Sequence, residues 1–415
     1  MPWSETSVMD NRMAFIAACE RGEEPISHLC ARYGISRRCG SKWLERYRDA
    51  GLFGLMERSR ARHTQALATT PEIAAAVVAL RERRPTWGPK KLLARLRADQ
   101  PETSWPAAST VGDLLRRAGL SKARPLRRAG PLAAAPLVLD PWAANGSWSA
   151  DFKGWFRTGD GVRCEPLTVT DGYSRYILCC EAVPRVTFAA IQPVLTRVFR
   201  EYGLPGALRT DNGNPFARRD GLGGLSQLSV WLLKLDVWPD RIAPRRPDMN
   251  GRHERMHRVL REDTASPPAA SMLLQQRRFD DWRVDYNTYR PHEALGQRCP
   301  ARLYAASERR YPEVIAAWSY PADHHVRKVV GDGHIIWRDR PVYLSAALRG
   351  ETVGLARRDD GDWAVRFRGF DLAIVADAGG ALKPLRLSRT PRLGEAGRGP
   401  VADQRGAAAS RGQSG

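Results

Sequence analysis

The sequence lacks a long uninterrupted apolar run, although 43% of its 415 residues are apolar. A membrane-spanning helix needs about 20 predominantly apolar residues, so no such helix is expected. The N-terminus reads Met-Pro-Trp-Ser-Glu-Thr and has no basic segment followed by an apolar one, so it does not look like a secretory signal. These absences predict a soluble, intracellular protein without a membrane partner.

Cysteine is scarce, and its positions are irregular. The chain holds seven, an odd number: Cys19, Cys30, Cys39, Cys164, Cys179, Cys180 and Cys299. This scatter does not suit a disulfide framework and fits a reducing compartment. No Cys-x-x-Cys pair occurs, and His28 with Cys30 has no partners at zinc-finger spacing, so a structural zinc site is not expected.

Acidic residues are the other shortage. The 45 Asp and Glu residues stand against 66 Lys and Arg, which gives a net charge of +21. A balance this basic favours a polyanionic partner, and without a membrane segment the expected partner is nucleic acid. A chain of this length suggests roughly two to four domains, each with its own core.

Residues 1–62 are predicted to form a helix-turn-helix domain. Apolar residues at helical spacing indicate one helix through 13–18 and another through 26–33, after which Gly34 breaks the chain and Ser36 caps a third helix. In the third helix Trp43 and Leu44 share an apolar arc, while basic residues line the other side.

The basic arc of the third helix is predicted to enter the DNA major groove. The predicted contacts are Arg37, Arg38, Ser41, Lys42 and Arg46. An ordinary solvated basic face would contain the same residues, so that alternative stays open. Gly40 lies inside this helix and is expected to lower its stability by about 1 kcal/mol.

Residues 70–120 are predicted to form a second helical unit, similar to a helix-turn-helix. Its helices are expected at 73–80, from Pro89 onward, and from a Ser109-Thr110 cap to Gly119. Lys90 and Lys91 are its predicted DNA contacts, and a helical spacer is the alternative. Residues 121–141 follow as a basic linker rich in Ala, Pro and Leu.

A strand-like period begins near residue 146 and predicts an α/β core over 142–306. Three short strands precede a helix at about 187–202. A strand ending at Asp211, a helix at 225–235, a strand or loop at 237–242 and a long helix from Met249 follow. The order βββαβαβα, or one strand fewer, predicts a mixed sheet.

The C-terminal third predicts a small β-barrel, or a sandwich, over 322–378. A helical segment at 272–305 comes first, and then short alternating runs with Asp-Gly turns at 332–333 and 360–361. Trp337 and Trp363 are expected in the barrel core, with DNA contact as the alternative. Residues 388–415 show no apolar periodicity and are expected to be disordered.

Three acidic residues in three settings form a candidate site. Asp151 lies in the middle of a strand, Asp211 just past a strand, and Glu254 on a helix. A carboxylate in a sheet costs free energy unless it binds something. Hard oxygen ligands suit Mg²⁺ or Mn²⁺, and two such ions roughly 3.5–4 Å apart can support an in-line displacement at phosphorus. We therefore predict these three acids as catalytic residues and ligands of two ions.

The helix that carries Glu254 is amphipathic. Its apolar arc holds Met249, Met256, Val259 and Leu260, and Glu254 points away from that arc together with Asn250, Arg258 and Arg261. The two arginines are predicted to hold the DNA backbone beside the metal ions.

Other polar residues near these motifs receive different roles. Asp171 in an Asp-Gly pair is expected to serve a turn. Asp171, Asn212 and Asn250 are predicted to support the ligands without binding metal, although Asp171 is also a possible fourth ligand. Glu293 is the alternative third acid. His253 and His257 are expected to contact DNA or lie at the surface rather than bind metal.

These segments together resemble the catalytic core of DDE transposases and retroviral integrases, and the whole chain resembles a bacterial insertion-sequence transposase. The matching segments are 148–154, 167–176, 210–216, 250–261 and 286–295. The resemblance implies an RNase H-like fold, metal ligation by Asp151, Asp211 and Glu254, and a basic residue seven places after the glutamate, here Arg261. The zinc module of the retroviral proteins is absent.

The resemblance also implies an activity and a setting. A DNA transposase would bind terminal inverted repeats through its N-terminal units, cleave the element ends, and join the 3′-hydroxyl to double-stranded target DNA. Such an enzyme would act as a dimer or larger homo-oligomer in the bacterial cytoplasm, in association with the nucleoid. The alternative is a DNA-binding protein without catalysis, either a regulator or a decayed relic. A glycosidase would not explain the charge or the arginines near Glu254.

Overall fold

The computed structural model describes residues 7–58, 69–121, 143–217, 222–242, 251–379 and 382–389. The chain divides into two compact units, Met1–Thr70 and Pro71–Gly415. Met249, Asn250, all but one residue of the predicted linker and nearly all of the predicted tail lie outside the described residues. Within the described ranges, no helix combines the length and apolarity needed to cross a membrane.

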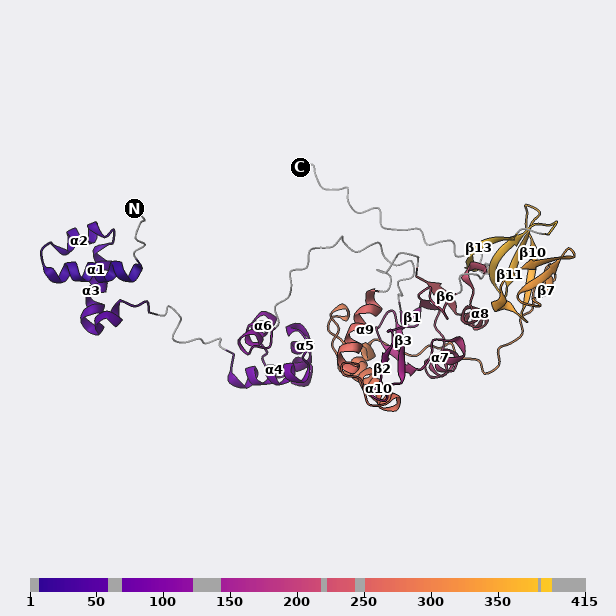
Figure 1. The fold of residues 1–415 in the computed structure, drawn as a ribbon, viewed down its shortest axis with the longest axis horizontal. Coiled ribbons are helices and arrows are strands. Elements are labelled where there is room, and N and C mark those ends of the chain that lie inside the picture. Colours follow the sequence, from indigo (N-terminus) through magenta and orange to yellow (C-terminus); the bar gives the residue numbers. More distant parts are fainter. Residues whose placement is uncertain are drawn as a thin grey trace. The chain divides into compact units, whose positions relative to one another are not determined.

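The first unit has the three helices that the sequence predicts: α1 Val8–Arg21, α2 Ile26–Arg32 and α3 Arg37–Ala50, followed by a 3-10 turn at Gly51–Leu55 (Figure 1). The hydroxyl of Ser7 caps α1, and that of Ser36 accepts the Cys39 N–H at the start of α3. Its core consists of Phe15, Ile16, Ala18, Leu29, Cys30, Trp43, Leu44 and Leu55. The apolar arc of α3 therefore packs inward, as its helical period requires.

Gly40 has a packing role that the sequence did not reveal. A Cβ at this position would lie 2.5 Å from Cys30 Sγ and 3.0 Å from Phe15 Cζ, and Gly40 is buried. The absence of a side chain lets α3 approach α1 and α2 closely. The close packing offsets the helix-propensity cost expected from glycine.

The second unit begins with α4 Pro71–Arg83, α5 Pro89–Asp99 and α6 Ala108–Arg117. The prediction of Pro89 at the start of a helix is confirmed. The predicted Ser109-Thr110 cap is wrong, because the extended residue before α6 is Ala107, so both hydroxyl residues lie in the first turn. The three helices enclose a core of Val77, Leu80, Trp87, Leu92, Leu93, Leu96, Val111 and Leu115.

A six-stranded mixed sheet follows, as the strand pattern predicts. Its strands are β1 Ser147–Phe152, β2 Phe156–Arg157, β3 Arg163–Asp171, β4 Ile177–Val183, β5 Ala207–Thr210 and β6 Trp238–Arg241. The pairs β1–β3 and β3–β4 are antiparallel, while β1–β5 and β5–β6 are parallel. The short β2 pairs with β3 and is an addition to the predicted order.

Helices cover both faces of this sheet. One face packs on α7 Phe188–Tyr202 and α8 Gln227–Lys234, through residues such as Trp148, Leu208 and Phe199. The other face packs on α9 Gly251–Thr264 and α10 Met272–Thr288, through Ile177 and Phe279 among others. Figure 1 shows α7 and the α9–α10 pair on opposite sides of β1 and β3. Strand alternation turns Asp151 away from the Trp148 face and toward the α9 face.

The predicted C-terminal barrel is not confirmed, because the sheets that the described residues form there are open. Its antiparallel order is β13-β12-β11-β10-β7, and the end strands do not pair; β8 and β9 form a separate hairpin. The strands are β7 His325–Lys328, β8 His334–Trp337, β9 Arg340–Tyr343, β10 Thr352–Arg357, β11 Trp363–Phe367, β12 Phe370–Val375 and β13 Leu382–Arg389. Trp337 and Trp363 are buried with ring centroids 5.0 Å apart, so the core role expected for them is confirmed.

The open sheet shares a hydrophobic core with the preceding α/β region. Leu222, Leu225, Val230 and Leu233 belong to the same cluster as Trp337, Val353 and Phe370. Polar contacts reinforce this packing: Lys234 Nζ lies 2.6 Å from Glu351, and the Arg368 guanidinium donates to the Lys234 carbonyl at 3.0 Å. Since α8 covers part of the apolar surface, the sheet does not need to close on itself to bury it.

Candidate active site

The parallel pairing of β1 with β5 aligns two of the predicted acids. Ser147 pairs with Ala207, and Ser149 with Arg209. Continued by two residues, this register would align Asp151 with Asp211, which lies just past the end of β5. Laterally paired residues of parallel strands point to the same face and lie about 4.8 Å apart along the hydrogen-bonding direction. By this extrapolation, we expect both carboxylates near the carboxyl ends of the two strands, with Asp151 on the α9 face.

Thr168 stands on the other side of Asp151. The two residues are direct partners in the antiparallel β1–β3 pair, so their side chains share a face. The Thr168 hydroxyl is 3.1 Å from the Asp151 carbonyl oxygen, to which it donates. Thr168 is fully buried, whereas Asp151 is only partly buried.

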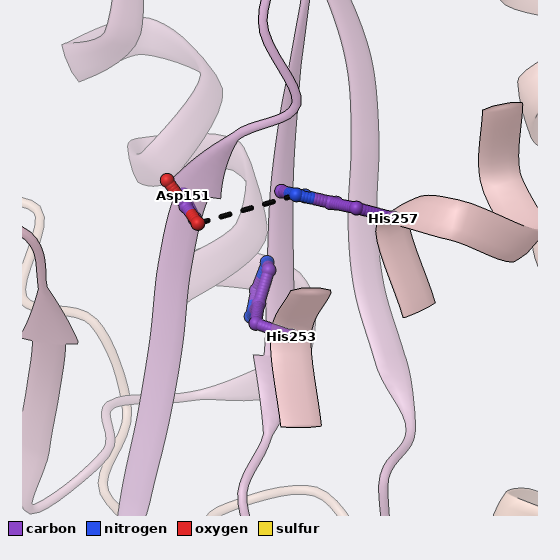
Figure 2. Close-up of side chains that lie close together, drawn as sticks. All are labelled: Asp151, His253 and His257. Atoms are coloured by element: carbon purple, nitrogen blue, oxygen red, sulfur yellow. Dashed lines mark ion pairs between the residues drawn. The ribbon is translucent and has the colours of Figure 1, made fainter. Parts of the chain in front are cut away.

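Helix α9 brings two histidines onto this hydroxyl. His253 and His257 are one turn apart and are only 4% and 7% exposed. Their Nε2 atoms lie 2.6 and 2.8 Å from Thr168 Oγ1, and His257 Nδ1 lies 4.0 Å from Asp151 Oδ2. Figure 2 shows the three side chains grouped, with the His257–Asp151 contact dashed. The expectation of surface or DNA contact for these histidines is therefore wrong.

Burial holds both imidazoles in the neutral form. Loss of hydration lowers the pKa of His253 to about 3. Loss of hydration, together with the nearby His253 and Lys153, lowers the pKa of His257 to about 2. Desolvation disfavours the charged imidazolium and therefore favours the neutral form of both side chains.

Glu254 lies on the exposed side of α9, as its helical position predicts, together with the exposed Arg258 and Arg261. Met256 and Leu260 are buried and Val259 is partly buried, which confirms the described part of the predicted apolar arc. Among the described residues, the three predicted carboxylates do not form a group whose ligand atoms all lie within 4.8 Å of one another, whereas Asp151, His253 and His257 do.

Asp211 opens a tight loop after β5. Its Oδ1 accepts the Gly213 N–H at 3.0 Å. The amide of Asn212 donates to the Ile242 carbonyl at 2.7 Å and so joins the loop after β5 to the end of β6. Asn212 thus holds the backbone beside Asp211, while Asn250 lies outside the described residues.

Asp171 is occupied by the turn between β3 and β4. The carboxylate is fully buried, and it accepts the Asn145 N–H at 2.8 Å, the Ser174 N–H at 2.7 Å and the Ser174 hydroxyl at 2.6 Å. These three bonds use both oxygens. Asp171 therefore serves the turn, as the Asp-Gly pair indicated, and not as a fourth ligand.

The second helical unit contacts the end of α10 with residues that were expected to face DNA. Lys90 Nζ lies 2.8 Å from Glu293, and burial lowers the pKa of the half-buried Lys91 to about 8, with Arg290 contributing.

Other residues of the second helical unit contact the end of α10 as well. Arg84 pairs with Asp285 through two guanidinium nitrogens. Further contacts are Trp87 to Tyr289, with ring centroids 5.8 Å apart, and Arg95 over the Tyr289 ring at 4.2 Å. Glu293 is exposed and pairs with a lysine, so nothing assigns it to the Asp151 site.

Most residues of the basic arc of α3 are exposed, unlike the paired basic residues of the second helical unit. Arg37, Arg38, Ser41 and Lys42 are exposed. Arg46 is half-buried, donates to the Met56 carbonyl at 2.6 Å and lies over the Trp43 ring at 4.6 Å. Arg46 therefore serves the packing of its own unit, and the other four residues keep the predicted position.

Sequence reasoning missed Thr168 and the role of the two histidines. Signals for both existed. Thr168 and Thr170 alternate with the apolar Leu167 and Val169 along β3, and His253 and His257 are four residues apart, which places them on one helix face. Histidine, however, occurs on both exposed and buried helix faces, so the helical period alone does not predict whether His253 and His257 are buried.

Comparison with known families covers both units. Residues 142–247 and 235–300 match Integrase core domain families, residues 11–63 match a Helix-turn-helix domain, and residues 39–115 match a Homeodomain-like domain. The matches to the integrase core include Asp151, Asp211 and Glu254.

Two insertion-element proteins are similar to much of the chain. The IS407 uncharacterized 31.7 kDa protein of Burkholderia multivorans is 28% identical over 247 residues, which are 59% of this chain and 85% of that protein. The IS476 uncharacterized 39.2 kDa protein of Xanthomonas euvesicatoria is 26% identical over 241 residues, or 58% of this chain and 66% of that protein. Together with the domain matches, these similarities support an insertion-sequence transposase of the DDE and integrase superfamily.

Solved structures give weaker likenesses. A chain of the simian T-cell lymphotropic virus intasome, in complex with the PP2A regulatory subunit B56 gamma, is 14% identical and covers 76% of this chain and 99% of its own, with a TM-score of 0.34. The HTLV-2 integrase catalytic core domain in complex with magnesium is 11% identical and covers 40% of this chain and 99% of its own, with a TM-score of 0.31. Scores this low do not by themselves establish a common fold.

Proposed function

We propose that this protein is a DNA transposase that binds the terminal inverted repeats of a mobile element, cleaves its ends and joins the 3′-hydroxyl to target DNA. The observation that supports the proposal is the parallel pairing of β1 with β5, whose register, if it continued past Ser149 and Arg209, would align Asp151 with Asp211. Helix α9, with Glu254, packs on that same face. The insertion-element relatives and the net charge of +21 support DNA as the substrate.

The oxygen ligands of these residues suit Mg²⁺ or Mn²⁺, and we propose that they bind two such ions. Adjacent carboxylates at the carboxyl ends of parallel strands supply hard oxygen ligands, and Glu254 would add a third from α9. When bound, such ions would lower the pKa of a nucleophilic oxygen and stabilise charge at phosphorus. The Gly213 N–H donates to Asp211 Oδ1 at 3.0 Å and so restrains that carboxylate.

The residues of the chain then have distinct tasks. Asp151, Asp211 and Glu254 would hold the ions, while Arg258 and Arg261, exposed one and two turns beyond Glu254, would bind phosphates of the DNA backbone. The α3 face with Arg37, Arg38, Ser41 and Lys42 would read the inverted repeat. Joining two element ends to one target requires a dimer or a larger homo-oligomer.

Asp151→Asn, Asp211→Asn and Glu254→Gln test the assignment. The substrate is a labelled duplex that carries the inverted repeat flanking the coding sequence, incubated with Mg²⁺ and plasmid target. We expect each variant to lose cleavage and joining, because a neutral amide is a poor magnesium ligand. Binding of the duplex, measured by fluorescence anisotropy, should stay within about twofold of wild type, because no phosphate contact is removed.

Glu262→Gln is the matched control, since this exposed acid lies on the same helix as Glu254 but farther along it. We expect full activity from this variant. Full activity in Asp151→Asn would exclude the proposed metal ligands. A wild-type protein that binds the repeat but neither cleaves nor joins it would favour a non-catalytic DNA-binding relic instead.

A further inference from the structure

The group of Asp151, His253 and His257 has the arrangement of a cation site. One ligand atom from each residue lies within 4.8 Å of one from each of the other two. Asp151 comes from β1, and the histidines come from successive turns of α9 (Figure 2). Two histidines four residues apart project from one helix face, a spacing that lets both imidazoles reach the same ion.

The hydrogen bonds around Thr168 determine which imidazole nitrogens carry protons. The Thr168 hydroxyl has one proton, and it contacts the Asp151 carbonyl oxygen, His253 Nε2 and His257 Nε2. The carbonyl can only accept, so the arrangement that satisfies all three contacts has the hydroxyl donating to it. Both histidines must then donate from Nε2 to the hydroxyl oxygen, which leaves a lone pair on each Nδ1.

The Nδ1 atom of His257, which carries the lone pair, lies 4.0 Å from the Oδ2 atom of Asp151. This nitrogen is therefore close enough to Asp151 for both atoms to bind one cation. His253 Nδ1, by contrast, lies 3.4 Å from the Thr170 hydroxyl. A cation beside Asp151 would therefore find His257 Nδ1 already oriented, whereas ligation by His253 would replace the contact of this imidazole with the Thr170 or the Thr168 hydroxyl.

The ligand chemistry selects the cation. Two neutral imidazoles with one carboxylate suit Zn²⁺ and other borderline ions, while Mg²⁺ prefers oxygen ligands and water. A tetrahedral zinc ion with bonds of about 2.0–2.1 Å holds its ligand atoms about 3.3 Å apart. The 4.0 Å separation of His257 Nδ1 and Asp151 Oδ2 has to close by less than about 1 Å, which side-chain rotation can supply.

We propose that Asp151, His253 and His257 form a zinc-binding site, distinct in its nitrogen ligands from the site proposed for magnesium. The two sites share Asp151, so Zn²⁺ bound here competes with the magnesium that catalysis requires. Binding of Zn²⁺ itself depends only on these three side chains. Inhibition of strand cleavage by Zn²⁺ rests, in addition, on the proposed transposase function.

Calorimetric titration of the full chain with ZnCl₂, under reducing conditions and without DNA, tests the binding. We expect wild type to bind about one equivalent more than His257→Gln. Glutamine places its amide nitrogen near the position of Nε2, so it can keep the bond to Thr168 while removing the Nδ1 ligand. Asp151→Asn, at a partly exposed position, gives a second test should the histidine variant fail to fold, and it should lose the same equivalent.

His28→Gln is the control, because His28 is exposed and belongs to the first unit. Its zinc stoichiometry should equal that of wild type, and circular dichroism checks that every variant folds. Equal stoichiometry in wild type, His257→Gln and Asp151→Asn overturns the proposal. Loss of the equivalent in a protein that shows no magnesium-dependent cleavage leaves the zinc site standing and removes only the proposed function.

Discussion

Helices α3 and α5 both carry basic residues near their starts, and they differ in where those residues lie. Each begins at a recognisable start, Ser36 for α3 and Pro89 for α5, and each carries consecutive bases in its first turns. In α3, Arg38 and Lys42 are exposed. In α5, the corresponding bases lie against the segment that follows α10, where Lys90 meets Glu293.

The contrast between α3 and α5 shows that a basic helix face predicts an acidic partner, but it does not predict whether that partner is DNA or a carboxylate of the same protein. The α5 bases find carboxylates within their own unit, and burial lowers the pKa of Lys91 to about 8. The exposed α3 bases leave DNA as the partner that we propose. Four predictions separate these two regions experimentally.

The largest expected effect is that low pH destabilises the second unit more than the first. Burial lowers the pKa of His253 to about 3, of His257 to about 2 and of His292 to about 3, against 6.5 for an exposed imidazole, and all three belong to the second unit. The unfolded chain therefore binds more protons below pH 6.5, so stability is complete above that pH and falls as pH decreases. We expect a loss of about 2 kcal/mol for each buried histidine between pH 6.5 and about pH 5.

Hydrogen exchange of peptides from each unit, followed against pH, measures this loss. Peptides of the sheet and α9 should lose protection well before peptides of α1–α3. His292→Gln should remove about one third of the pH dependence. Constant protection of the second unit from pH 6.5 down to about pH 5 would contradict the burial of neutral imidazoles.

The DNA contacts give the next largest difference. Replacing Arg38 and Lys42 together by Ala should weaken binding of the inverted repeat about a hundredfold near 0.1 M salt, since each lost phosphate contact costs about tenfold. Replacing Lys90 by Ala should change affinity less than about twofold, because its partner is Glu293. Anisotropy titrations at several salt concentrations measure both effects, and the reverse order of the two variants would exchange the roles of α3 and α5.

Glycines in the two helical units should respond in opposite ways. A Cβ at Gly40 would meet Cys30 Sγ at 2.5 Å, whereas one at Gly112 in α6 would make an ordinary 3.7 Å contact with Pro89. We expect Gly40→Ala to destabilise the first unit by about 2 kcal/mol through overpacking. Gly112→Ala should stabilise α6 by up to about 1 kcal/mol through helix propensity. Urea unfolding followed by hydrogen exchange compares them, and a stabilising Gly40→Ala would refute the packing role of this glycine.

The pair of Arg84 and Asp285 should contribute the smallest of these effects. A double-mutant cycle with Arg84→Met and Asp285→Asn, read by thermal unfolding, should give a coupling of about 1 kcal/mol, because the pair is partly buried and bidentate. The matched exposed pair, Arg116 with Asp113, should give less than about 0.5 kcal/mol. Equal coupling in the two pairs would show that α4–α6 gain no stability from this contact with α10.

Local features of the sequence predicted the elements well. Ser36 and Pro89 mark helix starts correctly, and the alternation of Trp148 and Ala150 with Asp151 predicts the two faces of β1. The interval between Asp151 and Asp211 is the same as the offset of the β1–β5 register, but no local pattern reveals that register. It depends on pairing between strands separated by β2, β3, β4 and α7 along the chain.

The sequence by itself determined the charge, the type and order of most helices and strands and the side of each element that is apolar, because these depend on neighbouring residues. Only the tertiary structure decided which partners each polar face meets. In the folded chain Lys90 pairs with Glu293, the C-terminal sheet is open and packs against α8, and His253 and His257 are buried against Thr168. These outcomes depend on contacts between distant segments, and the free energy of such a contact is set by both surfaces at once.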